Sequence, residues 1–313
     1  MNTPTTVQPD SPFDSQRIAP GALSKTRPMY WSVRRELWEN RSIYIAPLVV
    51  MAFVLFGSLI SIVRLPHRMQ TLPAHDPAVQ HDLVVMPFSI APAPIMLTTF
   101  LVGIVYSLDA LYGERRDRSI LFWKSLPVSD LTTVLSKASI PLVVLPLIAF
   151  VLSMITLDIM LLLSTAVLLA NGMSPATLWA EVRFFQEPLI MIYGLAVHAL
   201  WFAPIYGWLL LVSVWARRTP VLWAVLPLFA ISVVERIAFN TSHFRALLGY
   251  RVTGAMAEAF GVNPSGGGVG ILDQLSQLTP VRFLSSPGLW IGLAFAAAFL
   301  AAAARLRRNR EPI

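Results

Sequence analysis

The stretch SIYIAPLVVMAFVLFGSLISIV, residues Ser42–Val63, contains no charged residue. The hydrocarbon core of a bilayer is about 30 Å thick, and an α-helix needs roughly 20 apolar residues to cross it. This stretch meets that demand and predicts a membrane-spanning helix. Similar stretches follow at about residues 88–111, 138–170, 188–215, 220–239 and 287–304. The sequence therefore predicts an all-α, polytopic membrane protein with six transmembrane helices.

The composition agrees with a membrane protein and excludes several other classes. Only 13% of the 313 residues are charged, whereas soluble globular chains have about 25% charged residues. The net charge of +7 does not indicate nucleic-acid binding, because the basic residues lie mainly at the ends of the apolar stretches. The chain has no cysteine, which excludes disulfides, thiolate metal sites and cysteine nucleophiles.

The distribution of Lys and Arg predicts the orientation. Most of these residues fall on the side of the membrane that holds both termini, which predicts that both termini are cytoplasmic. We expect the membrane to be a bacterial inner membrane. A long polar lead precedes the first apolar stretch, so no cleaved signal peptide is expected. Residues 1–28 are rich in Pro, Thr and Ser and are expected to form a disordered tail. Residues 29–313 are expected to form one transmembrane domain.

The residues just before the first span predict an amphipathic helix. Its apolar face would be formed by Tyr30, Val33 and Leu37, with Trp31 and Trp38 beside it, and its polar face by Arg34, Arg35 and Glu36. Such a helix lies in the membrane surface rather than across it. The alternative interpretation is a simple extension of the first span.

The connector between spans two and three, residues 112–130, is charged first and apolar second. Its charged part contains Glu114, Arg115, Arg116, Asp117 and Arg118, and its apolar part contains Ile120, Leu121, Phe122 and Trp123. A loop that only reversed the chain direction would not need four consecutive large apolar residues. We therefore expect the apolar part to be buried in the membrane surface or in a partner protein.

A long outer segment, about residues 240–286, precedes the last span. Residues 245–250 and 254–260 are predicted to form short helices that are too short and polar to cross a membrane, and a glycine-rich turn follows at 263–268. We interpret this segment as re-entrant or interfacial helices.

No catalytic or cofactor motif is present. The sequence lacks a Gly-Lys pair, which excludes a phosphate-binding P-loop, and it lacks the H-E-x-x-H and G-x-S-x-G motifs. The first outer loop contains His67, His75, His81, Asp76 and Asp82, but their spacing matches no metal site. We expect no enzymatic activity, metal or cofactor in this chain alone.

Several polar residues lie within the predicted spans, where charge is costly. Asp109 is expected to pair with Arg115 or Lys137, and Asp158 to pair within the bundle or line a wet cavity. His198 lies among aromatic residues, and it either packs through a hydrogen bond or contacts a substrate. A stripe of small residues, Gly288, Gly292 and Ala296, predicts close helix packing, either within the subunit or at a subunit interface.

The connector resembles the signature region of the ABC-2 type permeases, the transmembrane subunits of one class of ABC exporters (type V exporter-like). The resemblance is carried by Glu114-Arg115 at the end of span two, a short helix, and Leu126-Pro127 followed by Val128-Ser129. Arg118 stands where many members have glycine. The layout is also similar: an interfacial helix, six spans with both ends inside, and a long outer segment before the last span.

The resemblance implies a dimer of permeases, identical or related, above two separate ATPase subunits that hold the ATP and Mg. A coupling helix, about residues 114–126, would dock on the ATPase, with Glu114 to Arg118 as a charge-complementary rim. Its movement would switch a cavity between inward and outward access. The candidate cavity residues are Phe53, Phe56, Met96, Phe100, His198, Phe229 and Val233. Walls of this kind suit an apolar or amphipathic substrate.

Three other functions compete with this one. A secondary transporter or channel would need inverted repeats or several mid-membrane charges, and neither is evident. A membrane enzyme would need a clustered catalytic set. A regulatory subunit without transport activity is not distinguished from a permease by the sequence.

Overall fold

The computed structural model describes residues 26–71, 77–119, 128–182, 186–261 and 275–309. Within these residues the regular structure is helical and contains no strand. Helices long and apolar enough to cross a membrane are Ser42–Val63, Leu83–Arg116, Asp130–Ala170, Pro220–Phe239 and Pro287–Asn309. These are 5 spans, or up to 6 if a bent helix pair counts as one span. The prediction of a polytopic helical protein is confirmed.

The first half of the chain forms α1 (Thr26–Glu39), α2 (Ser42–Val63), α3 (Leu65–Thr71), α4 (Pro77–Ile90), α5 (Pro92–Asp109) and α6 (Tyr112–Arg116). Next, α8 (Asp130–Ser139) runs through a π-helical turn (Ile140–Val144) into α9 (Leu145–Ala170). The second half forms α10 (Ala176–Glu181), α11 (Gln186–Trp201), α12 (Ala203–Trp215), α13 (Pro220–Phe239), α14 (His243–Phe260), a short 3₁₀ turn (Leu275–Gln277), α15 (Pro280–Ser285) and α16 (Pro287–Asn309).

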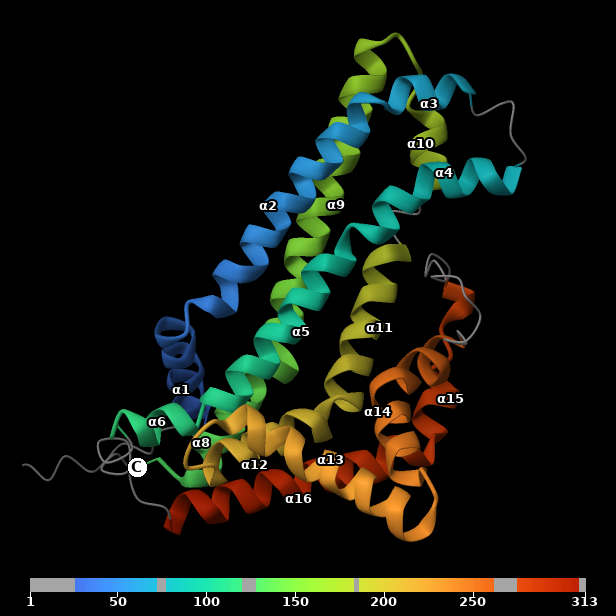
Figure 1. Cartoon of the computed structure of the whole chain (residues 1–313). Helices are drawn as coiled ribbons and strands as arrows, with labels where there is room; N and C mark the ends of the chain where they lie inside the picture. The colour runs from blue at the N-terminus through green and yellow to red at the C-terminus, as the bar shows by residue number, and fades with distance from the viewer. Residues whose placement is uncertain (1–25, 72–76, 120–127, 183–185, 262–274, 310–313) are drawn as a thin grey trace, which may run out of the picture.

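The helices form two groups that meet at one end of the molecule. Figure 1 shows α2, α5 and α9 rising side by side, while α12, α13 and α16 run across the base. Helix α16 packs along α12, where Gly207 allows the close approach: a Cβ at this position would lie 3.3 Å from the Ala296 backbone oxygen. Helices α1, α6 and α8 and the last turns of α16 meet in one region, which we call the connector end.

The third span is longer than the sequence predicted and contains a local distortion. It begins at Asp130 and passes through the π-helical turn at Ile140–Val144. Pro141 lies in this turn, and a proline has no N–H to donate to the preceding helical turn. Gly103 of α5 faces it: a Cβ there would lie 3.3 Å from the Pro141 Cβ and 3.2 Å from the Tyr206 ring.

The fourth span is broken, which the sequence interpretation did not anticipate. Helices α11 and α12 are bent by 46° at Phe202. Pro204 stands in the first turn of α12, where its missing N–H costs nothing, and it prevents α11 from continuing.

The outer segment contains one helix where two short ones were predicted. Helix α14 is continuous from His243 to Phe260 and ends at Gly261, whose φ of 64° suits glycine. Its start is held by Glu235 of α13, whose carboxylate accepts hydrogen bonds from the His243 and Phe244 amides (2.7 and 2.9 Å). A carboxylate at a helix N-terminus satisfies amides that have no partner within the helix.

The small-residue stripe of α16 packs against side chains of α14 as well as against the backbone of α12. The Arg251 guanidinium stacks over the Trp201 ring, 4.6 Å from its centroid, and donates to the Gly288 carbonyl (3.1 Å). It lies where a side chain at Gly292 would be. Burial lowers the pKa of this guanidinium from its ordinary value. In the single chain the stripe therefore serves packing within the subunit, and it accommodates a charged side chain as well.

Replacing Gly292 with alanine is expected to displace the Arg251 guanidinium from the space beside Gly292, which we call the notch. The new Cβ would overlap the guanidinium, which would lose its hydrogen bond and its stacking on Trp201. We expect the free energy of unfolding to fall by about 1–3 kcal/mol. The matched control is Gly57→Ala in α2, because a Cβ at Gly57 meets nothing within 4 Å. Equal thermal stability of the two purified variants would contradict the role given to the notch.

Candidate functional site: a buried ion-pair network at the connector end

Charged side chains from four helices are buried together at the connector end. Glu36 of α1 and Lys137 of α8 are each 2% exposed, Arg307 of α16 is 3% exposed, and Glu114 of α6 is 6% exposed. Apolar packing brings the helices together, because Val33 and Leu37 of α1 pack against Ile43, Tyr106, Ile140 and Leu145. Glu36 shares this inward side of α1.

Lys137 bridges two carboxylates. Its Nζ lies 2.8 Å from Glu36 Oε1 and 3.2 Å from Glu114 Oε1. The second oxygen of Glu36 accepts a hydrogen bond of 2.7 Å from the Tyr106 hydroxyl of α5. A buried lysine is tolerated only when opposite charges and hydrogen bonds replace its lost hydration. Lys137 therefore joins α1 and α6 to the start of the third span.

Arg307 makes the corresponding bridge from the last helix. Its guanidinium donates to Glu114 Oε2 at 3.1 Å and forms an ion pair with Asp130 at the start of α8. Arg35 of α1 adds a third cation, 3.7 Å from Glu114. Glu114 thus lies between Lys137, Arg307 and Arg35, and each of these comes from a different helix.

Arg115 ties the connector to the end of α12. Its guanidinium donates to the backbone carbonyls of Val214 and Ala216, the latter at 3.1 Å. Carbonyls in the last turn of a helix have no partner within the helix and attract cations. The Ser213 hydroxyl also accepts hydrogen bonds from the Leu111 and Tyr112 amides (3.0 and 2.8 Å). The beginning of the connector is therefore held from two sides.

The structure corrects the interpretation of the charged part of the connector. The sequence suggested that residues 114–118 form a charged rim for a partner, but Glu114 and Arg115 are buried within the chain. Arg116, Asp117 and Arg118 are exposed. Arg116 pairs with Asp117 (3.0 Å) and with Asp109 (3.7 Å). Arg118 has a φ of 55°, a left-handed conformation that glycine adopts without strain.

The apolar part of the connector, Ile120, Leu121, Phe122 and Trp123, lies outside the described residues. The predicted coupling helix over about 114–126 is therefore represented only by α6, Tyr112–Arg116, and the residues up to Ser119. Its docking role stays a prediction.

The helix predicted before the first span is present as α1, separated from α2 by Asn40 and Arg41, so it is no simple extension of the first span. Its location in the membrane surface stays a prediction. Its face differs from the predicted one. Val33 and Leu37 pack inward, whereas Tyr30, Trp31 and Trp38 are exposed, and Arg34 stacks over both tryptophans. Glu36, which was placed on the polar face, is buried. Its acceptor oxygens are needed by Lys137 and Tyr106.

The predicted cavity residues occupy different surroundings in the single chain. Phe53 and Phe56 of α2 and Phe229 of α13 are exposed, at 71%, 66% and 66%. Met96 packs beside Ile95 and Ala149. Phe100 and His198 belong to an aromatic group with Phe202 and Tyr206, and Val233 is partly buried on α13. Nothing in these positions tests their role in transport.

The other polar residues of the spans are placed as follows. Asp109 pairs with Arg116 rather than with Arg115 or Lys137. His198 lies 3.3 Å from the Tyr206 hydroxyl, in agreement with a hydrogen-bonded packing role. Asp158 is exposed on α9 rather than buried within the bundle of the single chain, and its role in lining a wet cavity stays a prediction. Within the described residues, no cluster of His, Asp and Glu has the geometry of a metal site.

Sequence reasoning missed the centre of this network. Lys137 was considered only as an orientation signal and as one possible partner of Asp109, Arg307 only as an orientation signal, and Tyr106 and Asp130 had no assigned role. One available signal was the position of Lys137, which stands at the border of a long apolar stretch and needs a buried counter-charge if the helix continues past it. The pairing itself joins residues up to 193 positions apart and could not be read from spacing.

The chain matches no known family model, no curated protein and no solved structure.

Proposed function

We propose that this chain is the transmembrane permease subunit of an ATP-binding cassette exporter. It would move an apolar or amphipathic substrate across a bacterial inner membrane, driven by a separate ATPase subunit that holds the ATP and Mg. The supporting observation is the buried network, in which Lys137 and Arg307 tie the connector to α1, α8 and α16. The proposal rests on this arrangement together with the resemblance of the connector sequence.

The network suits a connector that must transmit movement. A loop that receives force from a soluble partner transmits it only if the loop is rigidly attached to the membrane helices. Glu114 and Arg115 provide that attachment, since they bind α8, α16 and the end of α12. The exposed Arg116, Asp117 and Arg118 come directly before Ile120–Trp123 in the sequence. Charged residues beside an apolar centre are the usual composition of a protein interface.

Two distortions offer places where the spans could bend in response. The π-helical turn at Ile140–Val144 lies immediately after Lys137, and π-turns are often found at functional sites. The 46° bend between α11 and α12 packs nearby, because Gly103 contacts both Pro141 and Tyr206. In our proposal, ATP-driven movement of the connector pivots α8 about this region and changes access to a cavity between two permease subunits.

Reconstitution with a candidate ATPase encoded beside this chain would test the proposal. We expect ATPase stimulation and co-purification with the wild-type chain, and no ATP hydrolysis by the chain alone. Replacing Phe122 and Trp123 together with alanine should weaken both readouts at least ~10-fold, because large apolar anchors dominate such interfaces. The matched control is Val281→Ala with Leu284→Ala, two exposed apolar residues on α15.

Two results would overturn the proposal. One is unchanged coupling in the Phe122 and Trp123 double variant, with the ATPase still bound. The other is substrate movement in liposomes driven by a proton gradient without ATP, which would instead support a secondary transporter. Binding and stimulation without any substrate movement would support a regulatory subunit.

A further inference from the structure

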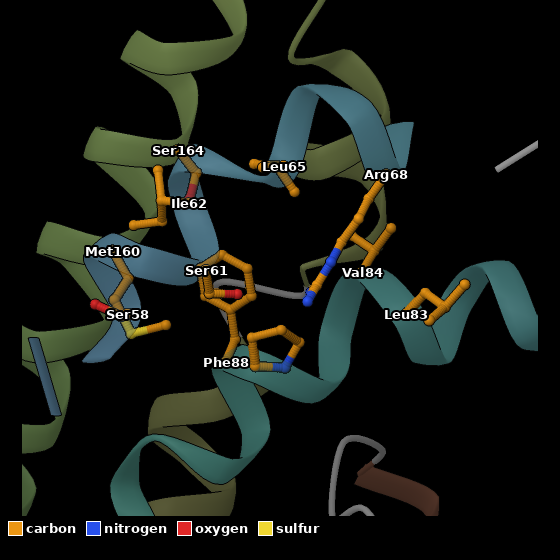
Figure 2. Close-up of a pocket in the computed structure, with 11 residues that line it drawn as sticks. Ser58, Ser61, Ile62, Leu65, Arg68, Leu83, Val84, Phe88, Met160 and Ser164 are labelled. Atoms are coloured by element: carbon orange, nitrogen blue, oxygen red, sulfur yellow. The ribbon is translucent and has the colours of Figure 1, made fainter. Parts of the chain in front are cut away.

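A cleft lies at the end of α2 that is far from the connector end. Figure 2 shows it between α2, α3, α4 and α9. Its volume is about 330 Å³, which includes the part open to the outside. It is separate from the ion-pair network and from the predicted cavity residues.

The lining of the cleft is apolar on most sides. Leu83, Val84 and Phe88 come from α4, Ile62 and Leu65 from α2 and α3, and Met160 from α9. Three hydroxyl groups interrupt this lining, those of Ser58, Ser61 and Ser164. The Ser58 hydroxyl donates to the Leu55 carbonyl at 2.8 Å, so its oxygen is still able to accept. The cleft therefore combines an apolar wall with a few polar groups.

Arg68 is the charged residue in this lining, and its side chain points from α3 into the cleft. Among the residues that the structure describes, no carboxylate pairs with its guanidinium, although other arginines of the chain form such pairs. A guanidinium carries five N–H donors in a plane that matches phosphate and carboxylate geometry. Within the part of the chain that the structure describes, the cleft thus presents an anion-binding group without a counter-charge beside an apolar wall.

We infer that this cleft binds the phosphate headgroup of an anionic membrane lipid. Arg68, with the Ser61 hydroxyl, would hold the phosphate, and the start of an acyl chain would lie against Phe88, Val84 and Met160. The apolar helix α2 ends at Val63, shortly before α3, so the cleft is expected to lie at the membrane surface, where lipid headgroups are found. Basic residues at the ends of spans lie at the level of lipid headgroups. The inference does not depend on the proposed transport function.

Lipid titration of the purified full-length chain tests this site. Thermal unfolding would be followed in detergent with added phosphatidylglycerol, phosphatidylcholine or inorganic phosphate. We expect phosphatidylglycerol to stabilise the wild-type chain, and Arg68→Gln to weaken this effect roughly 10-fold or more. The matched control is Arg64→Gln, which removes the same charge four positions earlier, outside the cleft lining.

A second variant separates shape from charge. Ser61→Phe keeps Arg68 but fills the cleft, and we expect it to abolish the stabilisation by phosphatidylglycerol while the chain stays folded. Equal responses of Arg68→Gln and Arg64→Gln would overturn the inference, because the effect would then be a general attraction of basic residues. Equal stabilisation by inorganic phosphate would also overturn it, since the apolar wall would then contribute nothing.

Discussion

Lys137→Met is expected to lower the free energy of unfolding by about 3–5 kcal/mol. The methionine preserves the apolar length of the side chain but removes the charge that Glu36 and Glu114 share. Both carboxylates are almost fully buried, and water does not reach them to replace the ammonium. Removing one partner of a buried pair leaves an uncompensated charge, which costs far more than the intact pair contributes.

Lys137→Met is also expected to affect α1 before the rest of the chain. Because Glu36 is the polar anchor of α1, this helix should detach from the bundle before the spans unfold. Trypsin cleavage after Arg34 and Arg35 should therefore become faster in Lys137→Met. The control is Arg41→Met, which removes an exposed cation at the start of α2. Similar thermal stability and similar cleavage of the two variants would contradict the anchoring role.

A double-mutant cycle isolates the pair. Glu36→Gln alone leaves Lys137 with Glu114 only, and Lys137→Met alone leaves Glu36 with Tyr106. The combined variant has neither buried charge, so its loss of stability should be smaller than the sum of the single losses by about 2 kcal/mol. Simple additivity would mean that the 2.8 Å contact between the two groups does not hold α1 in place.

The spans were predictable because their physical signal is local. A run of about 20 apolar residues is sufficient evidence for a crossing helix, and the bounds Ser42–Val63 and Pro220–Phe239 agree with the prediction. The bend at Phe202 was missed although Pro204 stood beside it. A proline can begin a new helix or kink an existing one, and packing against α16 and α5 decides between these outcomes.

The buried network was not predictable for a different reason. The sequence interpretation placed Glu36 on the polar face of α1, but Glu36 is three residues after Val33 and therefore lies on the same side of the helix. In the tertiary structure Lys137 and Tyr106 pack against that side, and both donate hydrogen bonds to the buried Glu36 carboxylate. The same applies to Glu114, whose partner Arg307 lies in the last helix. Long-range pairs of this kind leave no trace in local spacing.

Arg307→Met is expected to destabilise the connector end by about 3 kcal/mol. Arg307 neutralises Glu114 and Asp130 at once, and both carboxylates belong to the segment that surrounds the predicted coupling helix. Without it, the last turns of α16 and α6 lose their shared contact. Amide hydrogen exchange should therefore become faster in residues 112–119 and 300–309. The control is Arg305→Met, because Arg305 lies two positions earlier on α16 and is exposed.

The same variant separates structural support from docking. Arg307→Met should weaken ATPase coupling and lose hydrogen-exchange protection together, because the connector is no longer attached to the bundle. The Phe122 and Trp123 double variant should lose coupling while protection of residues 112–119 stays intact, since these side chains follow the anchored part of the connector. If Arg307→Met kept full protection, Glu114 would be held by Lys137 and Arg35, and the last helix would have no part in positioning the connector.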